Sequence, residues 1–460
     1  MPSDVPGFDL GLLSPVTAGH DELVSDHRFL DALVGAEVAL AEAYGTIGLA
    51  PAEVVEAIRE EFRADRGIRP SSGIDPAALA TDAVAGGNPV IPLVGVMKAR
   101  VPADAREWVH RGATSQDIWD SAIMIVAQRA VAQVSNSIRH AQEWLLQLAE
   151  RHREDVVVAR TLTQHAVPTT FALRAVNWQR GLRRAGDRLE ALEFPAQLAG
   201  AGGTLASFIE VTGSPERAQE LVAAFAQHAH LAAPDGPWHV LRDPVTEIGD
   251  ALVQSIDALG KFAADVATLS RTEIGEVAEG VGGGSSAMPQ KQNPAEAVLI
   301  RSAALRAPQL GATLHLASAL AVDERPDGAW HAEWPTLREL LRLALGAAWH
   351  ASSLAAHLRV DTVAASTNLN ETGGLVVAER LSLVLGPHIG REAIAALVAR
   401  AGAGEDLGDL VRAAIREHDL DRDADALLDP AGYTGLADIL VERALHADDR
   451  RGPVHRQEDA

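Results

Sequence analysis

The sequence predicts an all-α protein made of three helical regions. Alanine and leucine dominate its 460 residues, glycine and proline cluster in a few places, and alternating runs of β-branched residues are scarce. This composition favours helices over strands. A chain of this length is also too long for one compact core. We therefore expect an N-terminal helical domain over residues 1–107, a central bundle of long helices over 108–357, and a C-terminal helical domain over 358–460 with a frayed tail.

The central region carries the clearest helical periodicity. From Met124, apolar residues recur at alternating steps of three and four, at Ala127, Val131, Val134, Ile138, Ala141, Leu145 and Leu148. A second run of this kind passes through Leu252, Ile256, Leu259, Ala263 and Val266. Such heptad patterns indicate long helices. Residues 297–358 are almost continuously compatible with a helix, which Pro308 is expected to kink or interrupt. Long helices of this kind expose faces that other copies of the chain can cover, so we expect an oligomer.

Glycine and proline mark the expected boundaries. Residues 71–102 contain Gly86-Gly87-Asn88-Pro89 and Pro92, which predicts an irregular segment before the long helices. Residues 370–374 (Asn-Glu-Thr-Gly-Gly) predict a turn, followed by short amphipathic helices that end near Leu445. The charged tail beyond them lacks apolar anchors and is expected to be frayed.

Charge and composition exclude several classes of protein. The formal net charge of -23 makes nucleic acid or an anionic membrane surface an unsuitable partner. The N-terminus shows no signal peptide and the chain shows no membrane span, which predicts a cytoplasmic protein. There are no cysteines, and no histidine or carboxylate spacing typical of a metal site. We expect neither a metal nor an organic cofactor.

A glycine-flanked loop over residues 282–294 is the most informative segment. It combines a hydroxyl, a cation and an amide, and its glycines allow the backbone to present N–H groups. Ser285, Lys291 and Asn293 could together surround one carboxylate. A flexible surface loop is the alternative interpretation.

Two further polar segments stand at expected helix starts. His110-Arg111-Gly112-Ala113-Thr114-Ser115-Gln116-Asp117 precedes the first long helix, where its hydroxyls could serve only as caps. Because four hydrogen-bonding residues follow one another near a helix N-terminus, a carboxylate site is the better interpretation. The segment 160–170 contains Gln164 and His165, and a lone histidine there is more often structural than catalytic.

These segments resemble known families. The spacing GSSxMPxKxNP of residues 284–294 resembles the signature of the fumarase/aspartase superfamily, in which a C–N or C–O bond beta to a carboxylate is made or broken. The string HxGxTSQD resembles adenylosuccinate lyases and bacterial 3-carboxy-cis,cis-muconate cycloisomerases. The likeness to the cycloisomerases extends from about Asp31 to Leu445. Adenylosuccinate and argininosuccinate lyases have their acid-linked histidine where this chain has Leu162, whereas the cycloisomerases also lack it and keep the Gln164-His165-Ala166 string.

The resemblance implies roles for individual residues. It makes Ser285 the base, with Lys291 and Asn293 holding the charge that develops on a carboxylate. It places a small polycarboxylate substrate against a larger set of side chains: His110, Thr114, Ser115, Gln116, Gln164, His165 and Arg242. It also implies a homotetramer whose active sites are assembled from three subunits.

The resemblance predicts an enzyme, and first of all a cycloisomerase that closes 3-carboxy-cis,cis-muconate to a lactone in aromatic acid degradation. The alternative is a beta-elimination lyase that releases fumarate from a substituted succinate such as nitrosuccinate. It is favoured by Gln292, because bacterial cycloisomerases often have arginine directly after the signature lysine. A catalytically silent structural protein on the same fold is a third interpretation.

Overall fold

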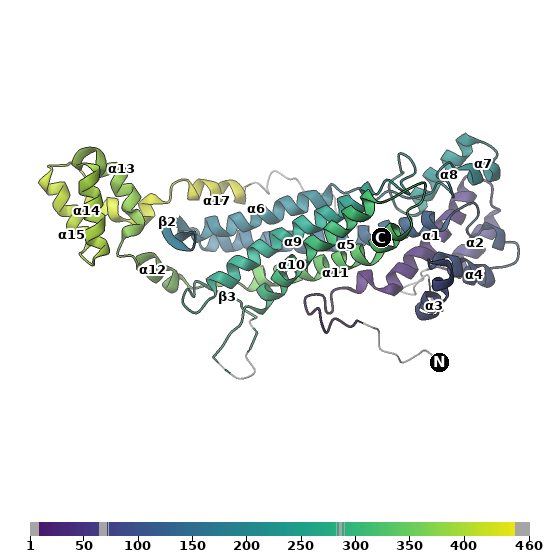
Figure 1. The fold of residues 1–460 in the computed structure, drawn as a ribbon, viewed down its shortest axis with the longest axis horizontal. Helices are drawn as coiled ribbons and strands as arrows, with labels where there is room; N and C mark the ends of the chain where they lie inside the picture. Colours follow the sequence, from purple (N-terminus) through teal and green to yellow (C-terminus); the bar gives the residue numbers. More distant parts are fainter. Residues whose placement is uncertain are drawn as a thin grey trace. The chain divides into compact units, whose positions relative to one another are not determined.

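The computed structural model describes residues 9–63, 71, 73–281, 283, 284, 288 and 290–446. Within these residues the protein is predominantly helical, which confirms the predicted all-α class (Figure 1). The predicted base Ser285 and the tail predicted to be frayed lie outside the described residues.

Helices form most of the described chain. The first group is α1 (Asp26–Thr46), α2 (Ala52–Glu61), α3 (Pro76–Gly86), α4 (Val90–Arg100), α5 (Ser115–Arg151), α6 (Phe171–Glu190), α7 (Ala206–Thr212), α8 (Pro215–His228) and α9 (Asp243–Leu269). The second group is α10 (Ala295–Ala319), α11 (Gly328–His357), α12 (Thr362–Asn370), α13 (Ala378–Ile389), α14 (Arg391–Gly402), α15 (Leu407–Glu417), α16 (Ala424–Leu428) and α17 (Ala437–Leu445). Short 3-10 helices occur at Glu22–Val24, Arg106–Trp108, Leu375–Val377 and Pro430–Tyr433.

Strands are few and short. An antiparallel hairpin joins β1 (Val156–Thr161) to β2 (Gln164–Thr170), and a second pair joins β3 (Val277–Ala278) to β4 (Arg359–Val360). The sequence interpretation did not foresee the hairpin, because it treated residues 160–170 as part of a helix start. Three consecutive valines begin β1, and β-branched side chains suit a strand. Helix α6 follows directly after β2.

The predicted heptad stripes are confirmed. On α5 the residues of the stripe from Ala127 to Leu148 are at most 3% exposed, and those of the second stripe on α9 are 0% exposed. Burial of one such leucine or valine side chain stabilises the fold by roughly 1.5–3 kcal/mol. The turn at Asn370 and the short helices up to Leu445 are also confirmed.

Two details of the predicted boundaries are wrong. Residues 76–100 are not irregular but form α3 and α4. Pro76 begins α3 behind the capping side chain of Asp75, and Gly87 ends it with a left-handed φ of 73°. Proline and glycine here mark helix ends rather than a loop.

Pro308 does not interrupt its helix. It lies inside α10, which continues on both sides of it, and the alternative expectation of a kink at Pro308 stays a prediction. The interruption falls instead at residues 320–327, where Asp323 has a φ of 55° and Pro326 follows. A chain at such a backbone angle cannot continue a right-handed helix.

The chain divides into two compact units. The first comprises Met1–Asn136, Ala185–Asp257 and Ser302–Trp349, and the second comprises Ser137–Arg184, Ala258–Arg301 and His350–Ala460. In the first, α1 packs against α2 and α8. In the second, α13, α14, α15 and α16 share an apolar core that includes Leu381, Leu385 and Val411. The three-domain division expected from the sequence stays a prediction.

Candidate active site

A tight turn precedes α5 in the first unit. His110 and Gly112 both have left-handed backbone angles, with φ of 59° and 75°. A side chain on Gly112 would lie 3.1 Å from the ring of Phe208, so this position requires glycine. The Ser207 hydroxyl donates to the Gly112 carbonyl at 2.6 Å. The turn therefore delivers Thr114 and Ser115 to the N-terminus of α5.

Asp117 joins the segments around this helix start. Its carboxylate accepts the backbone N–H groups of Thr114 at 2.9 Å, Ala199 at 2.9 Å and Gly200 at 3.1 Å. The ring nitrogen Nε2 of His239 lies 2.8 Å from the same carboxylate. A buried carboxylate needs partners of this kind, because an unpaired charge in the interior is costly. Asp117 thus fixes three distant segments of the chain in one place.

Arg242, predicted to bind a substrate carboxylate, is buried among protein carboxylates instead. Nη1 lies 2.8 Å from Asp120 and Nη2 lies 2.7 Å from Glu333, and Nε also donates to Glu333. Burial lowers the pKa of Arg242, but the charges of Asp120 and Glu333 outweigh it, so the pKa is raised and the group stays charged. All three guanidinium nitrogens bond to protein oxygens, which gives Arg242 a structural role, and its predicted substrate-binding role stays a prediction.

Gln116 is also turned inward. Its Nε2 donates to Asp120 at 3.1 Å and to the His239 carbonyl at 2.9 Å, and the side chain is 0% exposed. The amide therefore belongs to the same buried network as Arg242. Thr114 and Ser115 are half-buried and remain the accessible hydroxyls of the predicted segment.

His110 pairs with a buried glutamate. Nδ1 lies 2.7 Å from Oε1 of Glu37, whose side chain is 0% exposed. Burial alone lowers the pKa of His110, but the hydrogen bond and the charge of Glu37 outweigh it, and the pKa is raised above its ordinary value. His110 therefore carries its proton more readily than a free histidine.

The sequence interpretation missed one cation at this place. Arg325, in the loop before α11, donates from Nη1 to the Thr114 hydroxyl at 2.7 Å and from Nη2 to the Ala201 carbonyl at 3.0 Å. Arg325 and Thr114 are 211 positions apart, and no local spacing connects them. The only available signal was an arginine shortly before two tryptophans, Trp330 and Trp334.

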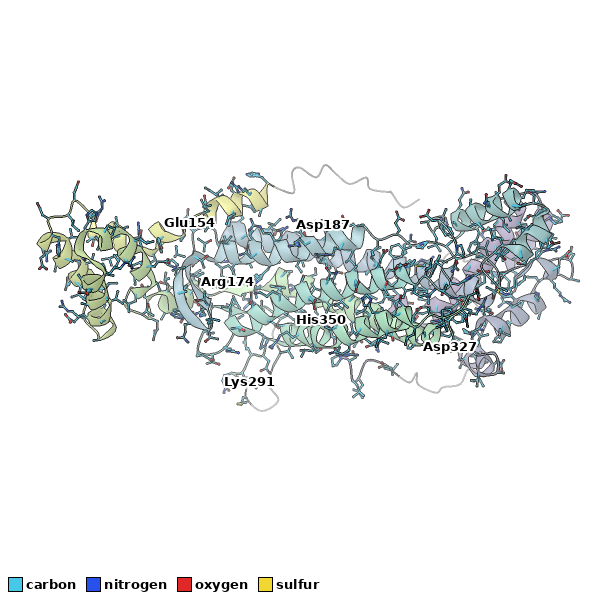
Figure 2. All side chains as sticks on the ribbon, turned by 45° about the horizontal axis from the view of Figure 1, so that its top comes forward. Glu154, Arg174, Asp187, Lys291, Asp327 and His350 are labelled. Carbon is cyan, nitrogen blue, oxygen red and sulfur yellow. The ribbon has the colours of Figure 1, made fainter. Side chains whose placement is uncertain are left out.

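In the second unit, the signature loop is closed at its base. Gly283 and Asn293 exchange backbone hydrogen bonds of 3.0 and 2.8 Å. Helix α10 begins directly after the loop. Glu279, which precedes the loop in the sequence, accepts the N–H groups of Glu296 and Ala297 at 3.1 and 2.8 Å and so caps the start of this helix. Both arrangements fix the loop ends. Lys291 is exposed on the loop (Figure 2).

A cavity of about 190 Å³ adjoins the loop. Asn293 and Gln292 line it, together with Ser270, Arg271 and Thr272. Position 292, where cycloisomerases often have arginine, therefore faces this cavity with a neutral amide. A single arginine, Arg271, is among the lining residues of the cavity.

The hairpin carries Gln164 and His165 at the start of β2. Its two-residue turn consists of Leu162 and Thr163, with φ of 48° and 71°. Left-handed angles cost a residue with a side chain about 1–2 kcal/mol each. Leu162 is 96% exposed, so burial of its apolar side chain does not offset this cost. Gln164 is exposed and His165 is half-buried.

Charged side chains anchor the hairpin near its turn. Arg160 and Arg174 donate to the two oxygens of Glu276 at 2.6 and 3.0 Å, and Asn368 adds a third bond. Burial raises the pKa of Glu276, but these partners outweigh it and the pKa is lowered. Arg174 lies on α6, beside the hairpin (Figure 2).

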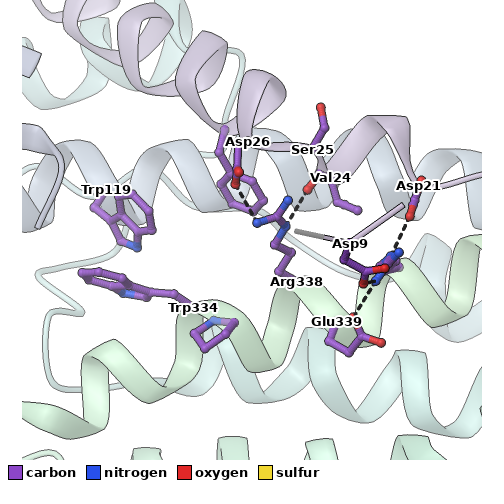
Figure 3. A pocket seen from close by; sticks show the side chains of 12 residues that line it. Asp9, Asp21, Val24, Ser25, Asp26, Trp119, Trp334, Arg338 and Glu339 are labelled. Atoms are coloured by element: carbon purple, nitrogen blue, oxygen red, sulfur yellow. Dashed lines mark hydrogen bonds and ion pairs between the residues drawn. The ribbon is translucent and has the colours of Figure 1, made fainter. Parts of the chain in front are cut away.

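The first unit has a second, larger cavity of about 640 Å³ (Figure 3). Trp119 and Trp334 form one wall, with ring centroids 4.3 Å apart. Its two arginines are neutralised, since Arg338 pairs with Asp26 at 2.6 Å and Arg342 pairs with Asp21 at 2.6 Å. Among its described lining residues, this cavity therefore presents no unpaired cation to an acidic substrate.

The structure brings the predicted residues together in two groups. His110, Thr114, Ser115, Gln116 and Arg242 gather in the first unit, around the start of α5. Gln164, His165, Lys291 and Asn293 belong to the second unit, on the hairpin and the loop. Each role predicted for them stays a prediction.

Comparison with known proteins agrees with the fold and these motifs. A family model described as Lyase matches residues 20–308. The chain belongs to this lyase family, within the fumarase/aspartase superfamily, which confirms the resemblance found in the sequence. It is therefore an enzyme of the lyase or cycloisomerase type.

Two curated relatives cover nearly the whole chain. It is 44% identical to a nitrosuccinate lyase from Streptomyces davaonensis, over 97% of each protein. It is 38% identical to a 3-carboxy-cis,cis-muconate cycloisomerase from Pseudomonas aeruginosa, over 96% of this chain and 97% of that one. Among solved structures, the 3-carboxy-cis,cis-muconate lactonizing enzyme from Pseudomonas putida matches with a TM-score of 0.85 and 32% identity, covering 96% of this chain and 99% of that one.

Two kinds of feature are absent from the described residues. They contain no helix with the length and apolar character needed to cross a membrane. They also contain no group of three or more histidine, cysteine or acidic side chains arranged to hold a metal ion.

Proposed function

We propose that this enzyme eliminates nitrite from a nitro-substituted succinate and releases fumarate. The observation that carries the proposal is the 44% identity with a nitrosuccinate lyase over 97% of both proteins. The sequence alone favoured cycloisomerisation, with this elimination as the alternative. The relatedness now favours the elimination.

In the proposed reaction, a base removes a proton from the methylene carbon next to one carboxylate. The electron pair first moves onto that carboxylate and then forms the carbon–carbon double bond as the C–N bond breaks. Nitrite leaves with the bonding electrons. We assign the base to Ser285 by its position in the signature, and the stabilisation of the negative carboxylate to Lys291 and Asn293.

The described geometry is compatible with this assignment. The backbone pairing of Gly283 with Asn293 leaves the Asn293 side chain available to donate, and that residue lines the 190 Å³ cavity. Gln292 lines the same cavity without a charge, which suits a substrate with fewer carboxylates than a tricarboxylate. Nitrite is a good leaving group and needs no strong acid, so Leu162 in place of a histidine is no obstacle.

The direct test is to add nitrosuccinate to the purified protein and measure nitrite and fumarate together. We expect both products in equal amounts, and a loss of turnover by orders of magnitude in Ser285→Ala with the fold unchanged. Absence of nitrite release at any substrate concentration would overturn the proposal. Ser285→Ala activity equal to that of the wild type would overturn the assignment of the base.

Cycloisomerisation is the second candidate, favoured by the 38% identity and by the TM-score of 0.85 to a lactonizing enzyme. Here a substrate carboxylate adds across a double bond of 3-carboxy-cis,cis-muconate and no group leaves. Loss of the diene absorbance on adding the protein is the expected signal. A diene spectrum that stays constant, alongside nitrite release from nitrosuccinate, would decide for elimination.

We also propose a homotetramer with shared active sites. Helix α10 and the residue that follows it carry an exposed apolar stripe: Val298, Leu305, Leu316 and Leu320 are 52%, 78%, 63% and 63% exposed. These positions fall on one side of the helix, and a row of this kind suits contact with another copy. Light scattering after size-exclusion chromatography should give four times the chain mass, and an active monomer would contradict the proposal.

A further inference from the structure

Arg325 differs from several other arginines of the first unit because its guanidinium contacts neutral oxygens. Its guanidinium is half-buried and bonds to two neutral oxygens, the Thr114 hydroxyl and the Ala201 carbonyl. In the part of the chain that the structure describes, no carboxylate forms an ion pair with it. Arg242, Arg338 and Arg342 in the same unit each pair with carboxylates. Arg325 therefore keeps a positive charge that no described residue of its unit neutralises.

The positive charge of Arg325 also lies near a second source of positive potential, the N-terminus of α5. Thr114 immediately precedes α5, a helix of 37 residues whose N-terminus carries a partial positive charge. A cation beside that end is unfavourable unless an anion joins it. The nearby carboxylate of Asp117 is already held by three backbone N–H groups and His239. An additional anion would balance the positive charges of Arg325 and of the helix N-terminus.

The guanidinium also has donors to offer. It carries five N–H groups, and the bonds to Thr114 and Ala201 use one hydrogen each on Nη1 and Nη2. The planar fork matches the two oxygens of a carboxylate, which an arginine can bind through two parallel hydrogen bonds. The Thr114 hydroxyl that Arg325 contacts is itself half-buried.

We propose that Arg325 is a substrate-binding residue, which holds one carboxylate of the substrate together with Thr114. The substrate class is a small dicarboxylate. The inference rests on the proposed function, because it takes the ligand to be the acid on which that reaction acts. It adds a cation without a carboxylate partner among the described residues, whereas the predicted residues His110 and Arg242 each pair with a protein carboxylate.

Calorimetric binding of fumarate to the full-length protein tests the inference without relying on turnover. We expect Arg325→Gln to weaken fumarate binding about 10- to 100-fold, as loss of a charged hydrogen bond does. Arg325→Lys should recover only part of the loss, because lysine lacks the fork. Arg217→Gln is the matched control. Arg217 is also half-buried in the first unit and donates to a backbone carbonyl, that of Ile47 at 2.7 Å, and its replacement should leave fumarate binding unchanged.

A purely structural role is separated by chemical rescue. Guanidinium ion at millimolar concentration should restore fumarate binding to Arg325→Ala when the lost group is a ligand for the acid. It should leave Arg217→Ala unaffected. Arg325→Gln that binds fumarate within threefold of the wild type would overturn the inference. So would a loss of binding that guanidinium does not restore, or a wild-type protein that binds no dicarboxylate.

The two proposals fail in different ways. A protein that binds fumarate through Arg325 but releases no nitrite would refute the elimination and leave this inference standing. Nitrite release that is indifferent to Arg325→Gln, with unchanged fumarate binding, would refute this inference alone.

Discussion

Gly283 and Asn293 donate their backbone N–H groups to each other's carbonyl oxygens, at 3.0 and 2.8 Å, and so close the signature loop. The closure uses the backbone of Asn293 and not its side chain. Structure and chemistry at this residue can therefore be separated by mutation.

Replacement of Asn293 by alanine should remove activity while keeping the loop closed. The backbone pairing persists, but the amide that we assign to the developing charge is lost. Removal of one such donor typically lowers kcat by about 10²–10³-fold. Steady-state kinetics and thermal unfolding should be measured together, with the exposed loop residue Gln290 changed to alanine as the control. Equal kcat values for the two variants would contradict the assigned role.

Replacement of Arg242 by methionine should unfold the first unit much more easily. It leaves the buried carboxylates of Asp120 and Glu333 without their cation, and breaking a buried pair in this way costs about 3–5 kcal/mol. Urea denaturation measures the loss. Arg59→Met, which removes an exposed ion pair with Glu56, is the control and should change little. A stable Arg242→Met protein with a raised KM would instead restore the binding role predicted from the sequence.

The pair of His110 and Glu37 predicts a pH dependence of stability. The pKa of His110 is raised in the folded protein, so the pair stabilises the fold fully below the ordinary histidine value of about 6.5. That stabilisation is lost as the pH rises through the folded pKa. Glu37→Gln should therefore lower the melting temperature at pH 6 more than at pH 9. Calorimetry at both values checks this, and a gap that widens with pH would be the wrong sign.

The strained turn at Leu162 and Thr163 predicts a conflict between stability and activity. Asparagine followed by glycine suits a two-residue hairpin turn with two left-handed angles. The double replacement Leu162→Asn with Thr163→Gly should raise the free energy of unfolding by about 1–2 kcal/mol. Because strain of this kind collects at functional sites, we expect kcat/KM to fall at the same time. A variant that is both more stable and fully active would show that the turn has no functional role.

Local patterns accounted for the parts of the fold that depend on neighbouring residues. The buried stripe from Ala127 to Leu148 repeats within one helix, so its period is visible in the sequence. The signature around Lys291 and Asn293 is likewise contiguous. The helices α3 and α4 were missed because their prolines and glycine resemble loop punctuation until the helix ends are known.

Contacts between distant segments could not be predicted. Arg325 reaches Thr114 across 211 positions, and neither residue signals the other. The predicted substrate-binding role of Arg242 came from the family resemblance and not from any contact visible in the sequence. Its actual partners, Asp120 and Glu333, lie 122 and 91 positions away. Only the folded structure shows which carboxylate side chains pair with Arg242.

The hydrogen bonds of Asp117 have a consequence for how this family can diversify. One carboxylate locks the start of α5, the glycine turn at Gly200 and His239 into a fixed framework, and it does so without contributing a donor for the substrate. Residues that approach the framework from other segments, such as Arg325, can then be exchanged without rebuilding it. Related enzymes could in this way acquire new acids as substrates through single replacements at the rim of an unchanged scaffold.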